Sequence, residues 1–195
     1  TSNISGGEGG TWCAQVPACS AVAVYADYQP TLNRACELAH ILGEASLRDR
    51  LIAYPAIAQN PSLLSCEIAG RFFMDAFLAQ LLEETEWERR EHAAVLWQAL
   101  RQIGVNLLHL PFRFELSHRL HEERRHGYLS VNDINKLTNT IWEDYFADTV
   151  RGSDQYVWAA KLHFYLPREP HYDWQYTAGY LIAAVLRRRL LADGC

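Results

Sequence analysis

Apolar side chains recur at steps of three and four residues along most of this chain, which is the spacing of one face of an α-helix. After Pro30, steps of three and four residues connect Leu32, Cys36, Ala39, His40 and Gly43. Gly43 is a residue type that often ends a helix, because glycine adopts the left-handed C-cap conformation without strain. We therefore expect the first helix to run from about residue 32 to residue 43.

Later segments with the same spacing carry their own start and stop signals. Asn60 is a favourable N-cap, and Pro61 suits the first helical position, where its missing N–H costs no hydrogen bond. These signals predict a helix over residues 61–84. Gly104 predicts the end of a helix over 86–103. Pro111 interrupts the next segment, so a further helix is expected over 112–126.

The C-terminal third continues the helical pattern. Ser130 followed by Asp133 approximates a capping box and predicts a helix that reaches about Ala147. Two more helices are expected over residues 154–164 and 172–192, joined by a loop that contains Pro167 and Pro170.

The N-terminal part has a different pattern. The run Ala21–Tyr25 is rich in β-branched and aromatic residues and lies between Pro17 and Pro30, so we expect one or two short strands there. Residues 1–12 contain two glycine pairs and little apolar surface, which favours a flexible arm or a tight turn. The predicted fold class is a mostly α protein that forms a single domain over residues 1–195.

Composition and charge exclude some classes of function. The formal net charge of −5 argues against general nucleic-acid binding, since neutralising phosphates needs a basic face. The longest apolar stretches are too short to span a membrane. Five cysteines spread over 195 residues favour a reducing compartment, so we expect a cytoplasmic protein. The sequence starts at Thr1 without a leader pattern, which fits a trimmed chain or one piece of a longer enzyme.

One cluster of residues in the first predicted helix has the spacing of a metal site. Cys36 and His40 lie four residues apart and share a helix face, and Glu37 flanks them. Glu67 follows in the next helix, whose antiparallel return would bring its carboxylate to the same point. Three such ligands leave a zinc ion a position for water, whose proton a carboxylate can take. The pattern predicts zinc held by Cys36, His40 and Glu67, with Glu37 as general base.

A structural interpretation of the same residues stays open. Glu-x-x-His arises often by chance in helices, with a surface carboxylate and a hydrogen-bonded histidine. Cys36 is equally suited to be a small buried side chain.

Further motifs resemble one family of peptidases. Around Glu37 and His40 the chain is similar to His-Glu-Leu-Gly-His-Ala, and Glu67-Ile68-Ala69-Gly70 is similar to the acidic, small-residue helix that follows it in oligoendopeptidase F and thimet oligopeptidase. The segments 162–167 and 172–181, with the sequences Leu-His-Phe-Tyr-Leu-Pro and Tyr-Asp-Trp-Gln-Tyr-Thr-Ala-Gly-Tyr-Leu, resemble the family's C-terminal block. Weaker likenesses are found at residues 112–115 and in the glycine-rich residues 9–13.

The resemblance implies a zincin-like helical catalytic domain with zinc as its cofactor. It implies that His163, Tyr172 and Tyr176 face the metal and donate hydrogen bonds to the oxyanion of a tetrahedral intermediate. It also implies that Asp75 supports the metal ligands. The residues of the glycine-rich turn that it assigns to substrate binding are Gly9, Gly10 and Trp12.

The chain also departs from the family pattern. Cys36 stands where the family has its first histidine, Ala39 where it has a glycine and Gly43 where it has a further histidine. A thiolate is a zinc ligand, although it donates more charge than imidazole and weakens the Lewis acid, so zinc-bound and metal-free forms both stay open. The chain also lacks the family's long N-terminal helical region. The site is therefore open, or a partner chain or a second copy covers it, or further residues precede Thr1.

These features lead to two expectations about function. The first is a metal-dependent hydrolase that cleaves an amide bond in a short peptide or peptide-like substrate, or the same fold turned to a metal-assisted biosynthetic reaction. The second is a pseudopeptidase that has lost zinc and binds a peptide or protein partner. We expect no nucleic-acid or membrane partner for either.

Overall fold

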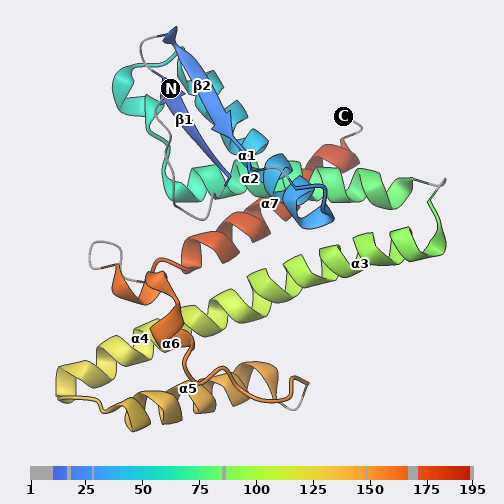
Figure 1. The fold of residues 1–195 in the computed structure, drawn as a ribbon. Coiled ribbons are helices and arrows are strands. Elements are labelled where there is room, and N and C mark those ends of the chain that lie inside the picture. Colours follow the sequence, from blue (N-terminus) through green and yellow to red (C-terminus); the bar gives the residue numbers. More distant parts are fainter. Residues whose placement is uncertain are drawn as a thin grey trace. The chain divides into compact units, whose positions relative to one another are not determined.

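The computed structural model describes residues 11–16, 19–27, 29–84, 87–147, 149–166 and 171–193 (Figure 1). The chain forms two compact units. Unit 1 comprises Thr1–Leu100 with Ala178–Cys195, and unit 2 comprises Arg101–Thr177. Independent folding of the two units is a separate property, so the single domain over residues 1–195 stays a prediction. Residues 1–10 of the arm expected over 1–12 lie outside the described residues.

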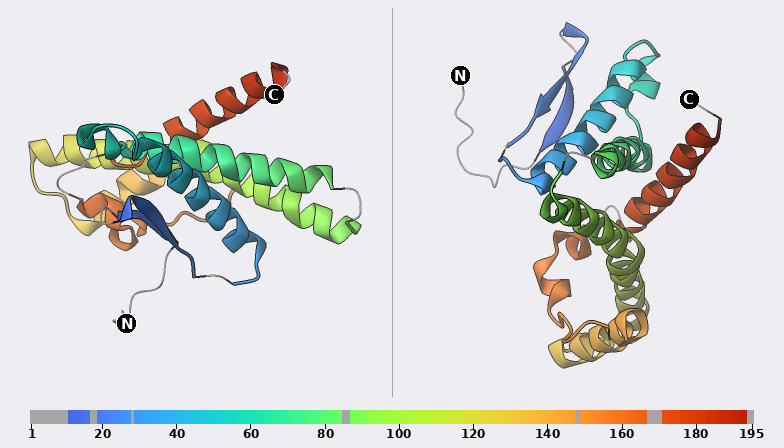
Figure 2. Two further views of the ribbon diagram at one scale, coloured as in Figure 1. Left: turned by 90° about the horizontal axis from the view of Figure 1, so that it is seen from above. Right: turned by 90° about the vertical axis from the view of Figure 1, so that its right-hand side faces the viewer.

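Unit 1 begins with a β-hairpin, as the strand pattern predicted. Strands β1 (Trp12–Val16) and β2 (Ala21–Tyr25) pair antiparallel, with Trp12 opposite Tyr25. The rings of these two residues stack at a centroid distance of 5.6 Å, and such cross-strand aromatic pairs stabilise a hairpin. The hairpin lies against the first helix, which Figure 2 shows from two further sides.

Two long helices form the body of unit 1. Helix α1 (Leu32–Leu51) starts at Thr31, whose hydroxyl accepts a hydrogen bond from the Arg34 N–H. Helix α2 (Leu63–Glu83) packs on α1 after the short 3₁₀ turn η2 (Ala56–Gln59). Helices α3 (Arg89–Gly104) and α7 (Trp174–Ala192) each run from one unit into the other.

Two predicted helix ends in unit 1 are wrong. Gly43 does not end α1, because it is buried in the contact between α1 and α2, where a Cβ would collide with the Ala69 carbonyl. Glycine therefore serves here as a close-packing residue and not as a cap. Helix α2 begins two residues later than predicted, because Ser62 and not Asn60 is the N-cap and accepts from the Ser65 N–H at 3.1 Å.

The break predicted between residues 104 and 112 is also wrong. Gly104 has helical angles, and the π-helical turn η3 (Val105–His109) leads without a gap into α4 (Leu110–His126). The Leu110 N–H donates to the carbonyl of Val105, five residues back. The wider turn accommodates Pro111, which has no N–H and would crowd the carbonyl of an ordinary α-turn.

In the rest of unit 2 one predicted helix is confirmed and another is wrong in length. Helix α5 (Val131–Phe146) has the predicted capping box, in which the Ser130 hydroxyl accepts from the Asp133 N–H and the Asp133 carboxylate accepts from the Ser130 N–H. The helix predicted over 154–164 is wrong in length. It is divided into α6 (Val157–Ala160) and the 3₁₀ turn η4 (Leu162–Tyr165), because Lys161 between them is extended.

Each unit has its own hydrophobic cluster. In unit 1 the cluster lies between α1, α2 and α3 and contains Cys36, Met74, Leu78 and Val95. In unit 2 the cluster consists of Phe112, Leu116, Ile141, Phe146 and Val157. The mostly helical fold with one N-terminal hairpin is thus confirmed. Within the described residues, no helix is long and apolar enough to cross a membrane.

Candidate functional site

Unit 1 brings an imidazole and two carboxylates together on the contact between α1 and α2. The Nε2 atom of His40 lies 3.2 Å from Oε1 of Glu44 and 3.7 Å from Oε2 of Glu67. One ligand atom from each of the three residues lies within 4.8 Å of the other two. Glu44 follows His40 by four residues on α1, while Glu67 comes from α2. The predicted approach of Glu67 to His40 is therefore present in the fold.

Glu67 is the most buried member of this group. Its side chain is only 6% exposed, and its Oε2 atom has no hydrogen-bond partner within the described part of the chain. Burial raises the pKa of Glu67, while the nearby His40 and Arg71 act in the opposite direction. The Arg71 Nε atom lies 3.6 Å from Oε2. Apart from these two neighbours, no donor within the described residues satisfies Oε2 with the geometry of a hydrogen bond, and such a buried oxygen is suited to a cation, because leaving it unsatisfied costs free energy.

Two glycines make room for the group. A Cβ atom on Gly70 would lie 2.5 Å from Nε2 of His40, so only glycine lets the imidazole lie across the α2 backbone. A Cβ atom on Gly179 would lie 2.7 Å from Cβ of Glu67. Helix α7 therefore passes directly over Glu67 and contributes to its burial. Gly70 and Gly179 both belong to motifs that carry the family resemblance.

A thiol approaches the group from the hairpin side. The Cys13 thiol on β1 donates to Oε2 of Glu44 at 4.0 Å, which holds the carboxylate whose other oxygen contacts His40. Nearby, the Arg48 guanidinium donates to the Cys66 sulfur at 3.4 Å. Burial raises the pKa of the Cys66 thiol to about 11, so this residue stays a neutral thiol at physiological pH.

Cys36 lies outside this group of ligand atoms. Its side chain is 1% exposed and belongs to the hydrophobic cluster with Met74, Leu78 and Val95. Cys36 shares a face of α1 with His40, as the spacing predicted. It packs against α2 near Met74, however, and Met74 lies seven residues beyond Glu67. Where the sequence placed Cys36 as the third ligand, the structure offers Glu44. A ligand role of Cys36 stays a prediction without geometric support.

Glu37, the predicted general base, is held by its neighbours on α1. Its carboxylate oxygens accept from Asn33 Nδ2 at 2.7 Å and from an Arg34 Nη at 2.6 Å. The Glu37 carboxylate is not a member of the His40 group. Its role as a base stays a prediction, and it requires the carboxylate to leave these two partners.

The pKa of Asp75 is influenced by charges of the site, which include His40 and Arg71. Burial raises its pKa, and the charges of Arg71, Arg187 and His40 oppose that shift. The carboxylate in turn raises the pKa of Tyr180, which is already raised by burial. Asp75 and Glu67 are therefore both influenced by the charge of Arg71. The supporting role that the resemblance implied for Asp75 stays a prediction.

Unit 2 brings the three predicted oxyanion donors together. The ring centroids of His163 and Tyr172 are 5.2 Å apart, those of Tyr172 and Tyr176 are 5.5 Å apart, and those of His163 and Tyr176 are 6.1 Å apart. Burial, Arg113 and Lys161 lower the pKa of His163, so its imidazole is neutral at physiological pH. The resemblance implied that these side chains face the metal ligands, which belong to unit 1. This placement stays a prediction.

A buried ion pair lies beside this aromatic group. Arg113 and Asp173 approach to 2.8 Å, with side chains 8% and 4% exposed. Burial lowers the pKa of Arg113 and raises that of Asp173, and each partner opposes the shift of the other. Since Asp173 directly follows Tyr172, this pair anchors the start of α7.

The residues predicted to bind substrate have separate outcomes. Gly9 and Gly10 lie outside the described residues. Trp12 is the first residue of β1, where its half-exposed ring stacks on Tyr25, and this packing contact gives no indication of substrate binding.

Sequence reasoning missed Glu44, although a signal was present. The rule that paired Cys36 with His40 also pairs His40 with a residue four positions later. Because Gly43 predicted the end of the helix, the predicted helix face with Cys36 and His40 did not include Glu44.

Comparisons of the chain with protein-family models, with curated proteins and with solved structures give no match.

Proposed function

We propose that this chain is a metal-dependent hydrolase that cleaves an amide bond in a short peptide or peptide-like substrate, with a divalent cation held by His40, Glu44 and Glu67. The observation that carries the proposal is the buried Oε2 atom of Glu67, which has no hydrogen-bond partner within the described residues and faces His40 at 3.7 Å. The fold proposed for it is that of a helical zincin of the oligoendopeptidase F type, on the motifs described above.

The donor set fits zinc. One imidazole nitrogen and two carboxylate oxygens are ordinary zinc ligands, and three protein ligands leave a position open for water or substrate. When bound, the ion would polarise the substrate carbonyl and lower the pKa of its water to about 7. The ligand atoms already lie within 4.8 Å of one another, so small side-chain movements would close them around an ion.

The neighbouring residues tune these ligands. Binding of a cation requires Glu67 in its ionised form, whereas burial favours the protonated form. The positive charges near Glu67 partly offset this cost. The Cys13 thiol donates to the Glu44 carboxylate oxygen that does not contact His40. We propose that Glu37 accepts the proton of the attacking water after its carboxylate leaves Asn33 and Arg34.

The aromatic group in unit 2 supplies hydrogen-bond donors to the proposed reaction. Neutral His163 and the hydroxyls of Tyr172 and Tyr176 can each donate to a developing oxyanion. The loss of one such donor lowers the rate by roughly a hundredfold to a thousandfold.

Metal analysis of purified variants tests the ligand set. We expect stoichiometric zinc in the wild-type protein, in Cys36→Ser and in the exposed control Glu83→Gln, and loss of zinc in Glu44→Gln and Glu67→Gln. Retention of zinc in Glu44→Gln together with its loss in Cys36→Ser would replace Glu44 with Cys36 as the third ligand.

A quenched fluorescent peptide tests the reaction itself. Glu37→Gln should keep its zinc and lose hydrolysis by a hundredfold or more, since general base catalysis contributes about a hundredfold to ten-thousandfold. Zinc-loaded wild-type protein that cleaves no peptide in a diverse library would refute the hydrolase.

A pseudopeptidase is the second candidate, and the environment of Cys36 favours it. The residue at the family's first ligand position is packed in the core of unit 1, and His40 contacts both carboxylates directly. In this function the contacts of Glu67 with His40 and Arg71 would take the place of a bound cation. Protein that contains no metal after purification in zinc-supplemented medium, yet binds peptides of the same library, would establish this function.

A further inference from the structure

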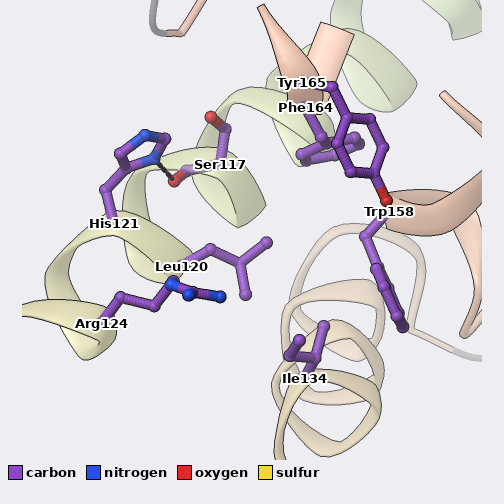
Figure 3. A pocket seen from close by; sticks show the side chains of 8 residues that line it. All are labelled: Ser117, Leu120, His121, Arg124, Ile134, Trp158, Phe164 and Tyr165. Carbon is purple, nitrogen blue, oxygen red and sulfur yellow. Dashed lines mark hydrogen bonds between the residues drawn. The ribbon is translucent and has the colours of Figure 1, made fainter. Parts of the chain in front are cut away.

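Unit 2 contains a cavity that the proposed reaction does not use. Its volume is about 410 Å³, within the usual range for small-molecule sites. In Figure 3 the α4 side chains of His121 and Arg124 stand on one side, and Trp158 and Tyr165 stand on the other. The lining residues that the structure describes all belong to unit 2.

The floor of this cavity is apolar and fixed by the core. Leu120, Trp158 and Phe164 pack on the buried cluster of unit 2, and Ile134 is 9% exposed. The Trp158 indole N–H donates to Asn135 Oδ1 at 2.9 Å, which sets the orientation of the ring. A ligand would therefore meet a preformed surface of aromatic and branched side chains, which favours flat aromatic groups.

The rim of the cavity is polar and carries a positive charge. Arg124 is exposed and forms no ion pair within the described part of the chain. The described lining residues include no carboxylate. The His121 ring donates from Nδ1 to the Ser117 carbonyl oxygen at 2.7 Å, so its orientation is fixed. An anion is thus attracted at one edge of an apolar surface, and none of the described lining residues is acidic.

We propose that this cavity binds a small planar aromatic carboxylate, with its rings against Leu120, Trp158 and Phe164 and its carboxylate on Arg124. Arginine and carboxylate form charge-assisted hydrogen bonds, often in pairs. Aromatic side chains contribute both buried area and ring contacts. The volume is at the lower end of the range for ligand sites, which suits a compound with two fused rings.

Calorimetric titration of the full chain, kept metal-free with a chelator, tests this site independently of the zinc proposal. The probe is 2-naphthoate, and its neutral analogue 2-naphthamide is the matched control ligand. We expect the carboxylate to bind with a Kd below about 1 mM, and the amide to bind about tenfold more weakly because it lacks the charged contact. Equal affinity for the two compounds, or no heat from either, would overturn the proposal.

Matched variants locate the charge contact. Arg124→Gln should weaken naphthoate binding about tenfold and leave naphthamide binding unchanged. Arg125→Gln makes the same change of charge one residue away, at an exposed arginine that pairs with Glu122 at 3.0 Å, and should bind like wild type. Equal weakening of naphthoate binding in both variants would show that the effect comes from the net charge of the protein, and it would refute the site.

Fluorine NMR of protein labelled with 5-fluorotryptophan locates the rings. The Trp158 signal, assigned from its absence in Trp158→Phe, should shift with naphthoate. The signal of Trp97, which is 69% exposed in unit 1, should not. A shift of Trp97 without a shift of Trp158 would place the ligand elsewhere and contradict the proposal.

Discussion

The contact between α1 and α2 in unit 1 and the aromatic cluster in unit 2 bury side chains in opposite ways. In unit 1 the glycines at positions 43 and 70 bring two helices so close that His40 lies directly on the neighbouring backbone. In unit 2 the large rings of Phe112, Trp142 and Phe146 pack edge to face or tilted, with centroids 4.2 to 5.9 Å apart.

The difference explains why the two units present different kinds of site. Small residues let polar side chains from two helices converge, which is the condition for a metal site. In unit 2 the cavity lies beside the core, at the side chains of Leu120, Trp158 and Phe164 that pack on the buried cluster. Unit 1 thus offers a compact polar group, and unit 2 offers an apolar cavity with a charged rim.

The largest expected effect tests the aromatic side of this comparison. Phe112 is fully buried, and its replacement in Phe112→Ala should lower the free energy of unfolding by about 4 kcal/mol, from lost burial and the cavity left behind. Phe73→Ala, at a ring that is 42% exposed, is the control and should cost far less. Chemical denaturation measures both. A cost for Phe112→Ala no larger than that of the control would show that the ring cluster does not stabilise unit 2.

The next effect tests the close packing in unit 1. In Gly70→Ala the new methyl group would overlap the His40 ring, so we expect a loss of about 1–3 kcal/mol from overpacking together with loss of bound zinc. Gly104→Ala is the matched control in another helix, since nothing lies within 4 Å of its Cβ position. It should gain about 0.5–1 kcal/mol from helix propensity. Thermal unfolding and metal analysis measure these effects, and normal zinc content in Gly70→Ala would contradict the proposed position of His40.

The smallest effect is a dependence on pH. Burial raises the pKa of Glu67, so metal-free folded protein holds this proton at a higher pH than the unfolded chain does. The resulting stability is present below the ordinary glutamate pKa and is lost as pH rises through the raised value. Glu67→Gln removes this dependence, and its stability relative to wild type should therefore increase from pH 4 to pH 8.

The control for this pH dependence is saturating zinc, which requires ionised Glu67 and should make wild type the more stable protein at pH 7. Denaturation curves in chelator and in zinc give the comparison. Asp75 and Asp173 also have raised pKa values, so only the difference between variant and wild type reports on Glu67. A difference that does not change with pH would show that Glu67 is not shifted by burial.

Local sequence signals located most elements correctly where the decisive contacts are local. The capping box at Ser130 lies within one turn, and the strand pattern of Ala21–Tyr25 is a property of five adjacent residues. Glycine and proline gave wrong boundaries, because their meaning depends on distant partners. Gly43 packs on Ala69, and Pro111 follows a π turn.

The same distinction holds for the candidate site. By itself the sequence determined that His40 and Glu67 lie on adjacent helices and that residues at four-residue spacing share the face of α1. Only the tertiary structure decided which neighbour on that face joins them. The close approach at Gly43 and Gly70 sets the stagger of α1 against α2, which places Glu67 beside His40 and Glu44 and leaves Cys36, on the same face of α1, packed against Met74 and Leu78 in the core. Helical periodicity fixes a direction around the axis, but the position along it depends on packing between helices.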